Sequence, residues 1–283
     1  YAALGEKTRA PLKKKPLEVQ TGNGWDRTLP CINLAVEELE THGWLVNQTR
    51  MWLSSDWTVR HGQDWRKGED RFFQHLIDGS RAANRLGWQW TTGIGSSKPY
   101  GFSRWQVEKR APGLCNRCQH KTQCPIQEWP DEPLLEAVPA PTRIDNYGPT
   151  TTIKTDAPTD VWLTAESLGE NDPALLHNPS IPAVFVFDEP LLMRLRISPK
   201  RIVFLVETLA EIAETRPLNI FLGDPQVELD GKQLAVTHAP VPGFQKYAQS
   251  LNIVETWPWP WLSQPNNAPV HSFSSWVKKA NKP

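Results

Sequence analysis

The chain has 283 residues, 39% of them apolar, and its 31 basic and 31 acidic residues give a formal net charge of zero. This length and apolar content predict a globular protein with room for two domains. The balanced charge excludes a global field that would hold the whole chain on nucleic acid, although a local basic patch can act without changing the total. The sequence shows neither a run of about 18 apolar residues nor a signal peptide, so we expect no membrane span and a cytoplasmic location.

Residues 1–127 have the pattern of a helical domain. Apolar residues recur there at spacings of three and four, which is typical of helices with one buried face. Helices are expected over residues 29–42, 44–61 and 65–77, with Gly43, Gly62 and Gly79 as their stops. Residues 91–110 lose this periodicity and are rich in Gly, Ser, Lys and Arg, so a surface loop is expected there.

Residues 128–158 are rich in proline and predict a linker. In residues 159–283, short apolar and β-branched runs alternate with helical patterns, which favours a parallel sheet with both faces covered. The expected strands are "DVWLT", "PAVFVF", "LNIFLG", "LAVTH" and "NIVETW". The clearest helix spans 198–215, with Ser198 as its N-cap and Pro199 in its first turn. The predicted fold class is α plus α/β, a helical domain followed by a small Rossmann-like domain.

All four cysteines lie in the helical part of the chain. Cys31 stands apart, whereas Cys115, Cys118 and Cys124 share the stretch "CNRCQHKTQC". Four thiolates match the ligands of one iron–sulfur cubane or of one zinc ion. Disulfides are disfavoured, because the two-residue spacing makes a poor bridge and no secretory signal is visible. We expect a [4Fe-4S] cluster, with zinc or no metal as the alternatives.

A basic segment with interleaved aromatic residues precedes and includes the cysteine stretch. Between Lys98 and Lys121, six basic residues are opposed only by Glu108. Basic residues position phosphates and aromatic rings stack on bases, so this segment predicts contact with DNA. The candidate DNA contacts are Lys98, Arg104, Lys109 and Arg110. The alternative is a solvated loop around a metal site.

The stretches "LPCINLAVEELETHGW", "GWLVNQTRMWLSS" and "DWRKGEDRFFQHLIDGSRAANRLGWQW" resemble the C-terminal half of the flavin domain of the photolyase/cryptochrome family. The resemblance runs without a gap from about Pro30 to Trp90 and implies FAD as cofactor. The cysteine spacing resembles that of [4Fe-4S] DNA glycosylases, and the remote Cys31 resembles the bacterial iron–sulfur photolyases. The resemblance implies FAD-binding roles for Asn47, Arg50, Asp78, Gly79, Ser80 and Asn84.

Within this set, the resemblance implies that Arg50 pairs with Asp78 and that Asn84 faces flavin N5. A carboxamide both donates and accepts hydrogen bonds, so it can follow N5 through its redox states. Trp88 and Trp65 match two members of a tryptophan chain that relays an electron to the photoexcited flavin, and the third member is not evident.

The resemblance also implies a cavity for a flipped pyrimidine dimer, lined by Met51 and Trp90. Two positions depart from the family pattern: Ser80 replaces a second Asp, and Val46 replaces the His of many members. Nothing in residues 1–28 matches the family's phosphate-binding half, so an upstream segment or a second polypeptide is expected to complete the FAD site.

The stretch from "VWLTAESLGENDPALLHNPS" onward resembles the family's α/β antenna domain, here placed after the flavin part and with its pigment undefined. The expected function is light-dependent repair, in which reduced FAD gives an electron to a pyrimidine dimer in damaged DNA. Two alternatives are a cryptochrome-like photoreceptor and a non-repairing partner subunit of a split photolyase. A third is a cluster-bearing helical module that binds single-stranded nucleic acid without a flavin, with a precedent in the primase large subunit.

Overall fold

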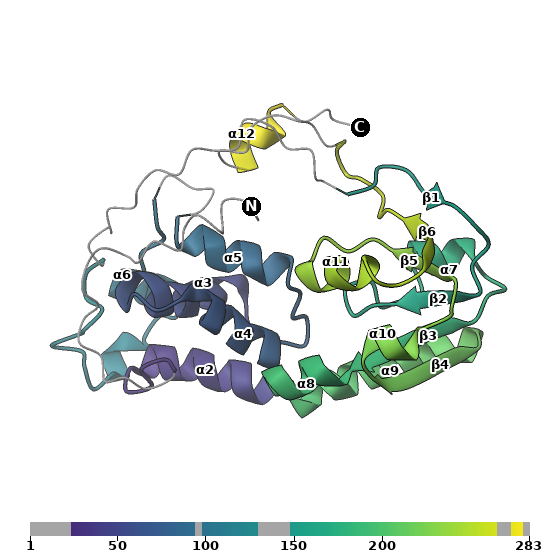
Figure 1. The fold of residues 1–283 in the computed structure, drawn as a ribbon. Coiled ribbons are helices and arrows are strands. Elements are labelled where there is room, and N and C mark those ends of the chain that lie inside the picture. Colours follow the sequence, from purple (N-terminus) through teal and green to yellow (C-terminus); the bar gives the residue numbers. More distant parts are fainter. Residues whose placement is uncertain (1–23, 94–97, 130–147, 265–272, 280–283) are drawn as a thin grey trace. The chain divides into compact units, whose positions relative to one another are not determined.

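The computed structural model describes residues 24–93, 98–129, 148–264 and 273–279. Contacts divide the chain into two compact units, which are described separately below (Figure 1). The first comprises Tyr1–Arg143 and Ala268–Lys278 and is helical, and the second comprises Ile144–Asn267 and Lys279–Pro283 and contains the sheet. The predicted class, α plus α/β, is therefore confirmed. No helix in the described ranges is long and apolar enough to cross a bilayer.

The helical unit is built from short helices around an aromatic core. Its elements are α2 (Pro30–His42), α3 (Asn47–Ser55), the π-helical turn η1 (Asp56–Arg60), α4 (Trp65–His75), α5 (Ala83–Thr91), α6 (Arg104–Arg110), the 3-10 turn η2 (Cys115–Arg117) and α12 (Phe273–Val277). Gly43 ends α2 with φ 67°, a left-handed conformation that glycine adopts without strain. Gly62 has φ 62° two residues after η1. Both predicted helix stops are thus confirmed.

The core of this unit contains large side chains from both described ranges, 24–93 and 98–129. Its aromatic members are Trp25, Trp52, Trp57, Trp65, Phe72, Trp88 and Phe102. Burial of each such ring stabilises the fold by about 1.5–3 kcal/mol. The helices are individually short, so this shared core, rather than helix propensity, holds them together.

Two details of the predicted helices were wrong. Helix α4 ends at His75, short of Gly79, because the chain turns extended at Leu76 and the Ile77 amide donates to the carbonyl of Gly43 at 2.8 Å. The predicted loop over 91–110 contains α6, which begins with a reciprocal capping box between Ser103 and Gln106. A seven-residue helix is too short to show the apolar period that sequence analysis relied on.

The second unit is a six-stranded sheet in the order β1-β6-β5-β2-β3-β4. Its strands are β1 (Ile153–Lys154), β2 (Asp160–Leu163), β3 (Ala183–Asp188), β4 (Leu218–Gly223), β5 (Leu234–Thr237) and β6 (Ile253–Trp257). All neighbours are parallel except β1 and β6. The five predicted strands are confirmed, and β1 falls inside the range predicted as linker.

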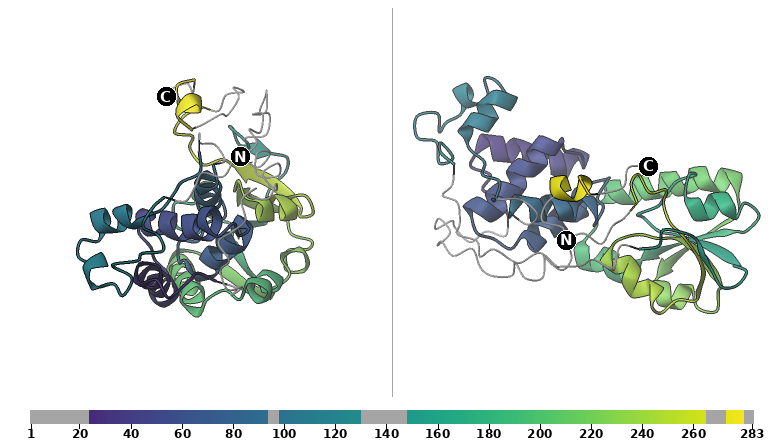
Figure 2. Two further views of the ribbon diagram at one scale, coloured as in Figure 1. Left: turned by 90° about the vertical axis from the view of Figure 1, so that its left-hand side faces the viewer. Right: turned by 90° about the horizontal axis from the view of Figure 1, so that it is seen from above.

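Helices lie on both faces of this sheet, as Figure 2 shows. They are α7 (Pro173–His177), α8 (Glu189–Leu195), α9 (Pro199–Thr215), α10 (Pro225–Glu228) and α11 (Pro242–Ala248). Helix α9 begins with Ser198 as N-cap and Pro199 in the first turn, as predicted, and it buries Leu205, Leu209 and Ile212. Covered faces explain why the central strands β2 and β5 are buried at every position rather than at alternate ones.

Candidate functional site

Arg50 of α3 is the centre of a polar network in the helical unit. Its Nη2 donates to both carboxylate oxygens of Asp78, at 3.1 and 2.8 Å, and its Nη1 donates to Oδ1 of Asn84 at 3.2 Å. Its Nε donates to the carbonyl of Leu45 at 2.9 Å. The planar guanidinium therefore fixes α3, the turn before α5 and the first turn of α5 in one arrangement.

The orientation of the Asn84 amide is set from both ends. While Oδ1 accepts from Arg50, Nδ2 donates to the backbone carbonyl of Ser80 at 3.1 Å. A carboxamide has two N–H groups and two lone pairs, so one of each remains for a ligand. The Ser80 hydroxyl accepts from the amide of Ala82 at 3.1 Å and thereby stabilises the turn that precedes α5. The adjacent Gly79 amide donates to the Leu76 carbonyl at 3.1 Å.

Apolar side chains are exposed on the elements that carry this network. Val46, which precedes α3, is 44% exposed, and Leu86 and Trp90 of α5 are 41% and 40% exposed. Leu86 and Trp90 are four residues apart and share one face of the helix. The Trp90 ring packs against Tyr100 at a centroid distance of 5.6 Å, and Met51 is half-buried. Neighbouring exposed apolar side chains of this kind typically mark a binding surface.

Trp88, on α5, is almost completely buried, with 1% of its surface exposed. Its ring makes edge contacts with Phe72 at 5.0 Å and with Trp57 at 6.4 Å. Trp65, also buried, has the Arg66 guanidinium 4.3 Å above its ring. Gly68 of α4 leaves room for Trp88, since a Cβ there would lie 2.1 Å from the indole. The position of the Trp88 ring therefore requires a glycine at residue 68.

Replacing Gly68 by Ala is expected to lower the free energy of unfolding by about 1–3 kcal/mol, because α4 and α5 must separate to admit the methyl group. Gly87→Ala in α5 is the matched control, since nothing lies within 4 Å of its Cβ position. In a helix, that change is neutral or stabilising. Urea unfolding followed by tryptophan fluorescence gives both values, and equal stabilities of the two variants would contradict this account.

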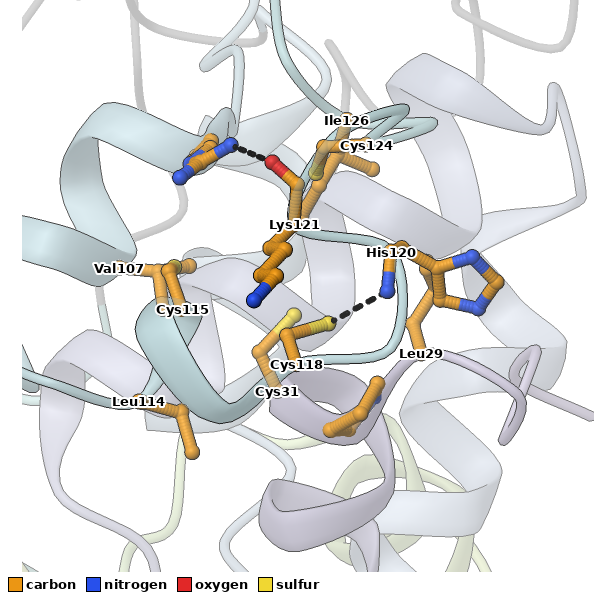
Figure 3. A pocket seen from close by; sticks show the side chains of 12 residues that line it. Leu29, Cys31, Val107, Leu114, Cys115, Cys118, His120, Lys121, Cys124 and Ile126 are labelled. Carbon is orange, nitrogen blue, oxygen red and sulfur yellow. Dashed lines mark hydrogen bonds between the residues drawn. The ribbon is translucent and has the colours of Figure 1, made fainter.

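The four cysteines line a single pocket, which Figure 3 shows from close by. Cys31 comes from α2, and Cys115, Cys118 and Cys124 come from η2 and the segment after it. All four are free thiols. Burial, with smaller contributions from the neighbouring charges of Asp56, Cys124 and Cys115, raises the pKa of Cys31 to about 12. The remote cysteine and the cysteine stretch are thus brought to the same place.

The pocket suits a soft metal by the chemistry of its donors, since thiolates are the preferred ligands of zinc and of iron–sulfur clusters. The His120 amide donates to Sγ of Cys118 at 3.4 Å, a contact of the kind that tunes bound clusters. Among the described residues, however, no three His, Cys, Asp or Glu side chains are arranged to hold a single metal ion. The pocket therefore has the donor set but not the convergence that one ion requires.

Arg60 fixes both ends of the segment that carries three of the cysteines. Its guanidinium donates to the carbonyls of Phe102, before that segment, and of Pro125 and Glu128 after it. Arg60 is 9% exposed, and Asp56, at the other end of η1, is fully buried. Sequence analysis missed both residues, although a π-helical turn that buries two charges is a frequent mark of a functional site.

The four side chains predicted to contact DNA differ in the contacts that they make within the protein. The Arg104 guanidinium donates to Glu108 at 2.8 Å and to the Lys121 carbonyl at 2.7 Å, so it holds the cysteine segment. Lys109 lies over the ring of Trp105, with Nζ 4.8 Å from the centroid, and Trp105 is 56% exposed. Lys98 and Arg110 are exposed. The exposed side of α6 thus combines a ring with positive charge.

The polar network lies in a region of the chain that is similar to known proteins. The family model described as the FAD binding domain of DNA photolyase matches residues 20–111. The helical unit is therefore similar to photolyases. This photolyase-like match contains the Arg50 network and Trp88 but ends before Cys115.

Individual proteins similar to this chain are also photolyases. A deoxyribodipyrimidine photo-lyase of Synechococcus sp. is 42% identical over 66 residues, which are 23% of this chain and 14% of the relative. That of Escherichia coli is 34% identical over 93 residues, 32% of this chain and 20% of the relative. That of Buchnera aphidicola is 30% identical over 142 residues, 44% of this chain and 29% of the relative. The chain thus spans less than a third of each of these relatives, and no solved structure matches it.

Proposed function

We propose that this chain is part of a light-dependent DNA-repair flavoprotein of the photolyase type, a carbon–carbon lyase. The observation that carries the proposal is the Arg50 network, which lies inside the region similar to the FAD-binding domain and leaves Asn84 with a free donor and a free acceptor. When bound, FAD supplies a light-driven electron to the substrate. The residues of this chain orient the flavin and receive the damaged base.

In this proposal each polar residue has a separate task. Asp78 and Asn84 present hydrogen-bonding groups to the flavin, and Arg50 fixes both while neutralising the carboxylate. The exposed Asn47 adds an amide one residue after Val46. Gly79 and Ser80 shape the turn before α5, since the Ser80 hydroxyl accepts from the amide of Ala82. Trp88 supplies a redox-active indole for the flavin, and the family resemblance gives the same role to Trp65.

The flavin also needs a second wall and donors for its pyrophosphate, which we propose an upstream segment or a second polypeptide supplies. Leu34 and Trp44 are 55% and 53% exposed in the helical unit, and Val46 is exposed as well. Apolar surface of this extent is consistent with a further interface. The short share of each relative that this chain covers agrees with a missing portion.

Damaged DNA is the proposed substrate. Trp90 offers an exposed aromatic face and Met51 an adaptable thioether for a base that has left the stack. Lys98, Lys109 and Arg110 are exposed and can meet phosphates. Arg104 contributes by holding the basic segment in shape, because its guanidinium is already bonded to Glu108.

The test is repair of an oligonucleotide carrying one pyrimidine dimer by the FAD-loaded, reduced protein in blue light and in the dark. Repair is expected only in the light, and Trp90→Ala is expected to slow it about tenfold or more, because the flipped dimer loses its stacking partner. Trp129→Ala, another exposed tryptophan, is the control and should repair normally. FAD-loaded protein that responds to light but repairs no dimer would favour the cryptochrome-like alternative instead.

We further propose that Cys31, Cys115, Cys118 and Cys124 bind a [4Fe-4S] cluster, with zinc as the alternative. The free thiols, their shared pocket and the Arg60 clamp support a four-thiolate site. The spacing of the cysteine stretch, which resembles that of [4Fe-4S] DNA glycosylases, is the reason to place the cluster ahead of zinc.

Protein purified without oxygen is expected to contain about four iron and four sulfide per chain, the composition of one cubane. Cys118→Ala should lose most of this iron, because a ligand is removed. His120→Ala is the matched control from the same pocket and should keep it, since four thiolates already suffice. One zinc per chain without iron, or loss of metal in the His120 variant alone, would contradict the cluster.

A further inference from the structure

Three tryptophans form a continuous line of ring contacts through the helical core. Trp88 meets Trp57 edge-on at a centroid distance of 6.4 Å, and Trp57 meets Trp25 at 5.1 Å. Both separations lie in the range of direct aromatic contact. Among the described residues, no ring contact joins Trp88 to Trp65. The nearest indole to Trp88 along this line is therefore that of Trp57.

Trp65 is also electrostatically unsuited to hold a positive charge. The guanidinium of Arg66 lies 4.3 Å from its ring centroid and that of Arg85 lies 6.0 Å away. An indole that loses an electron becomes cationic, so two nearby cations make its oxidation harder, although Asp64, 3.7 Å from Arg66, and Glu69, 3.1 Å from Arg85, offset part of this effect. No cation–π contact of this kind is made by Trp57 or Trp25 within the described chain.

The hydrogen bonds of the indole N–H groups also favour electron transfer along the line Trp88, Trp57, Trp25. Nε1 of Trp57 donates to the carbonyl of Asp64 at 2.9 Å, and Nε1 of Trp25 donates to that of Leu53 at 2.8 Å. In the described part of the chain, Nε1 of Trp88 and of Trp65 has no hydrogen-bond partner. Loss of an electron makes the N–H a stronger, charge-assisted donor, so a carbonyl partner stabilises the oxidised indole. Oxidation thus becomes easier on passing from Trp88 to Trp57.

Solvent exposure rises along the line, from 1% at Trp88 to 4% at Trp57 and 8% at Trp25. A soluble reductant can therefore reach Trp25 more readily than the other two. Phe72 touches both Trp88 and Trp25, at 5.0 and 6.0 Å, but a phenyl ring is much harder to oxidise than an indole. We assign it a packing role.

We propose that Trp57 and Trp25 carry the electron path outward from Trp88, in place of Trp65. The inference rests on the proposed flavin function. One electron passes from Trp88 to the photoexcited oxidised flavin, one from Trp57 refills Trp88, and one from Trp25 refills Trp57. The oxidised Trp25 then takes an electron from a soluble thiol, and two such events convert two thiols into one disulfide.

The test uses FAD-bound holoprotein, oxidised at the start and illuminated with blue light in the presence of dithiothreitol. Bleaching of the oxidised flavin band gives the rate, and transient paramagnetic resonance detects the tryptophan radical. Trp57→Phe is expected to slow bleaching about tenfold or more and to remove the long-lived radical. Trp65→Phe should change the rate by less than about twofold.

Trp52→Phe is the matched control, because Trp52 is equally buried but stacks on Phe102, outside the line. Trp25→Phe is the second variant, which keeps Trp57 and should shorten the radical lifetime even if Trp57→Phe folds poorly. Bleaching that depends on Trp65 and not on Trp57 or Trp25 would overturn the proposed path alone. Failure to bind FAD even in the presence of the polypeptide that carries the phosphate-binding half would overturn the proposed function, and this path with it.

Discussion

The guanidinium of Arg50 is bonded at once to a carboxylate, a side-chain amide and a backbone carbonyl, and the arrangement of the candidate flavin wall depends on it. Its energetic contribution is modest, because the Asp78 side chain is 56% exposed and solvent screens the pair to about 1 kcal/mol or less. The constraint is geometric instead. A planar fork with fixed donors leaves Asn84 a single orientation and leaves its remaining hydrogen and lone pair available.

That wall needs a rigid backing, which the aromatic core provides. Trp88 fills the space over Gly68 and is itself held by Phe72 and Trp57. The same packing that positions α5 places three indoles in contact, so structural support and the proposed electron path use one set of side chains. Arg60 plays a similar part for the cysteine pocket by joining η1 to both ends of its segment.

Local patterns made much of the fold predictable. The central strands are apolar runs in a covered parallel sheet, and the helix at 199–215 has its cap and proline in sequence. Strand β1 was not predicted because it has only two residues and forms by pairing with β6, which is distant in sequence. The carbonyls bound by Arg60 lie 42 to 68 positions away along the chain, so no local signal could indicate them.

Some contacts of the candidate site were also predictable from the sequence, and others were not. The pairing of Arg50 with Asp78 was expected from a family resemblance, and the structure contains it. The contact of Trp88 with Trp57, by contrast, depends on how η1 and α5 pack. Side-chain direction in three dimensions decides such contacts, and sequence spacing alone does not give it.

The central claim is that these 283 residues supply one wall of a flavin site and not the whole of it. Isothermal titration of the isolated chain with FAD tests this most directly. The account predicts a dissociation constant weaker than about 1 μM, tightening well below that value when the polypeptide with the phosphate-binding half is added, and weakening again with Arg50→Met. A one-to-one, sub-micromolar complex of the isolated chain would contradict it.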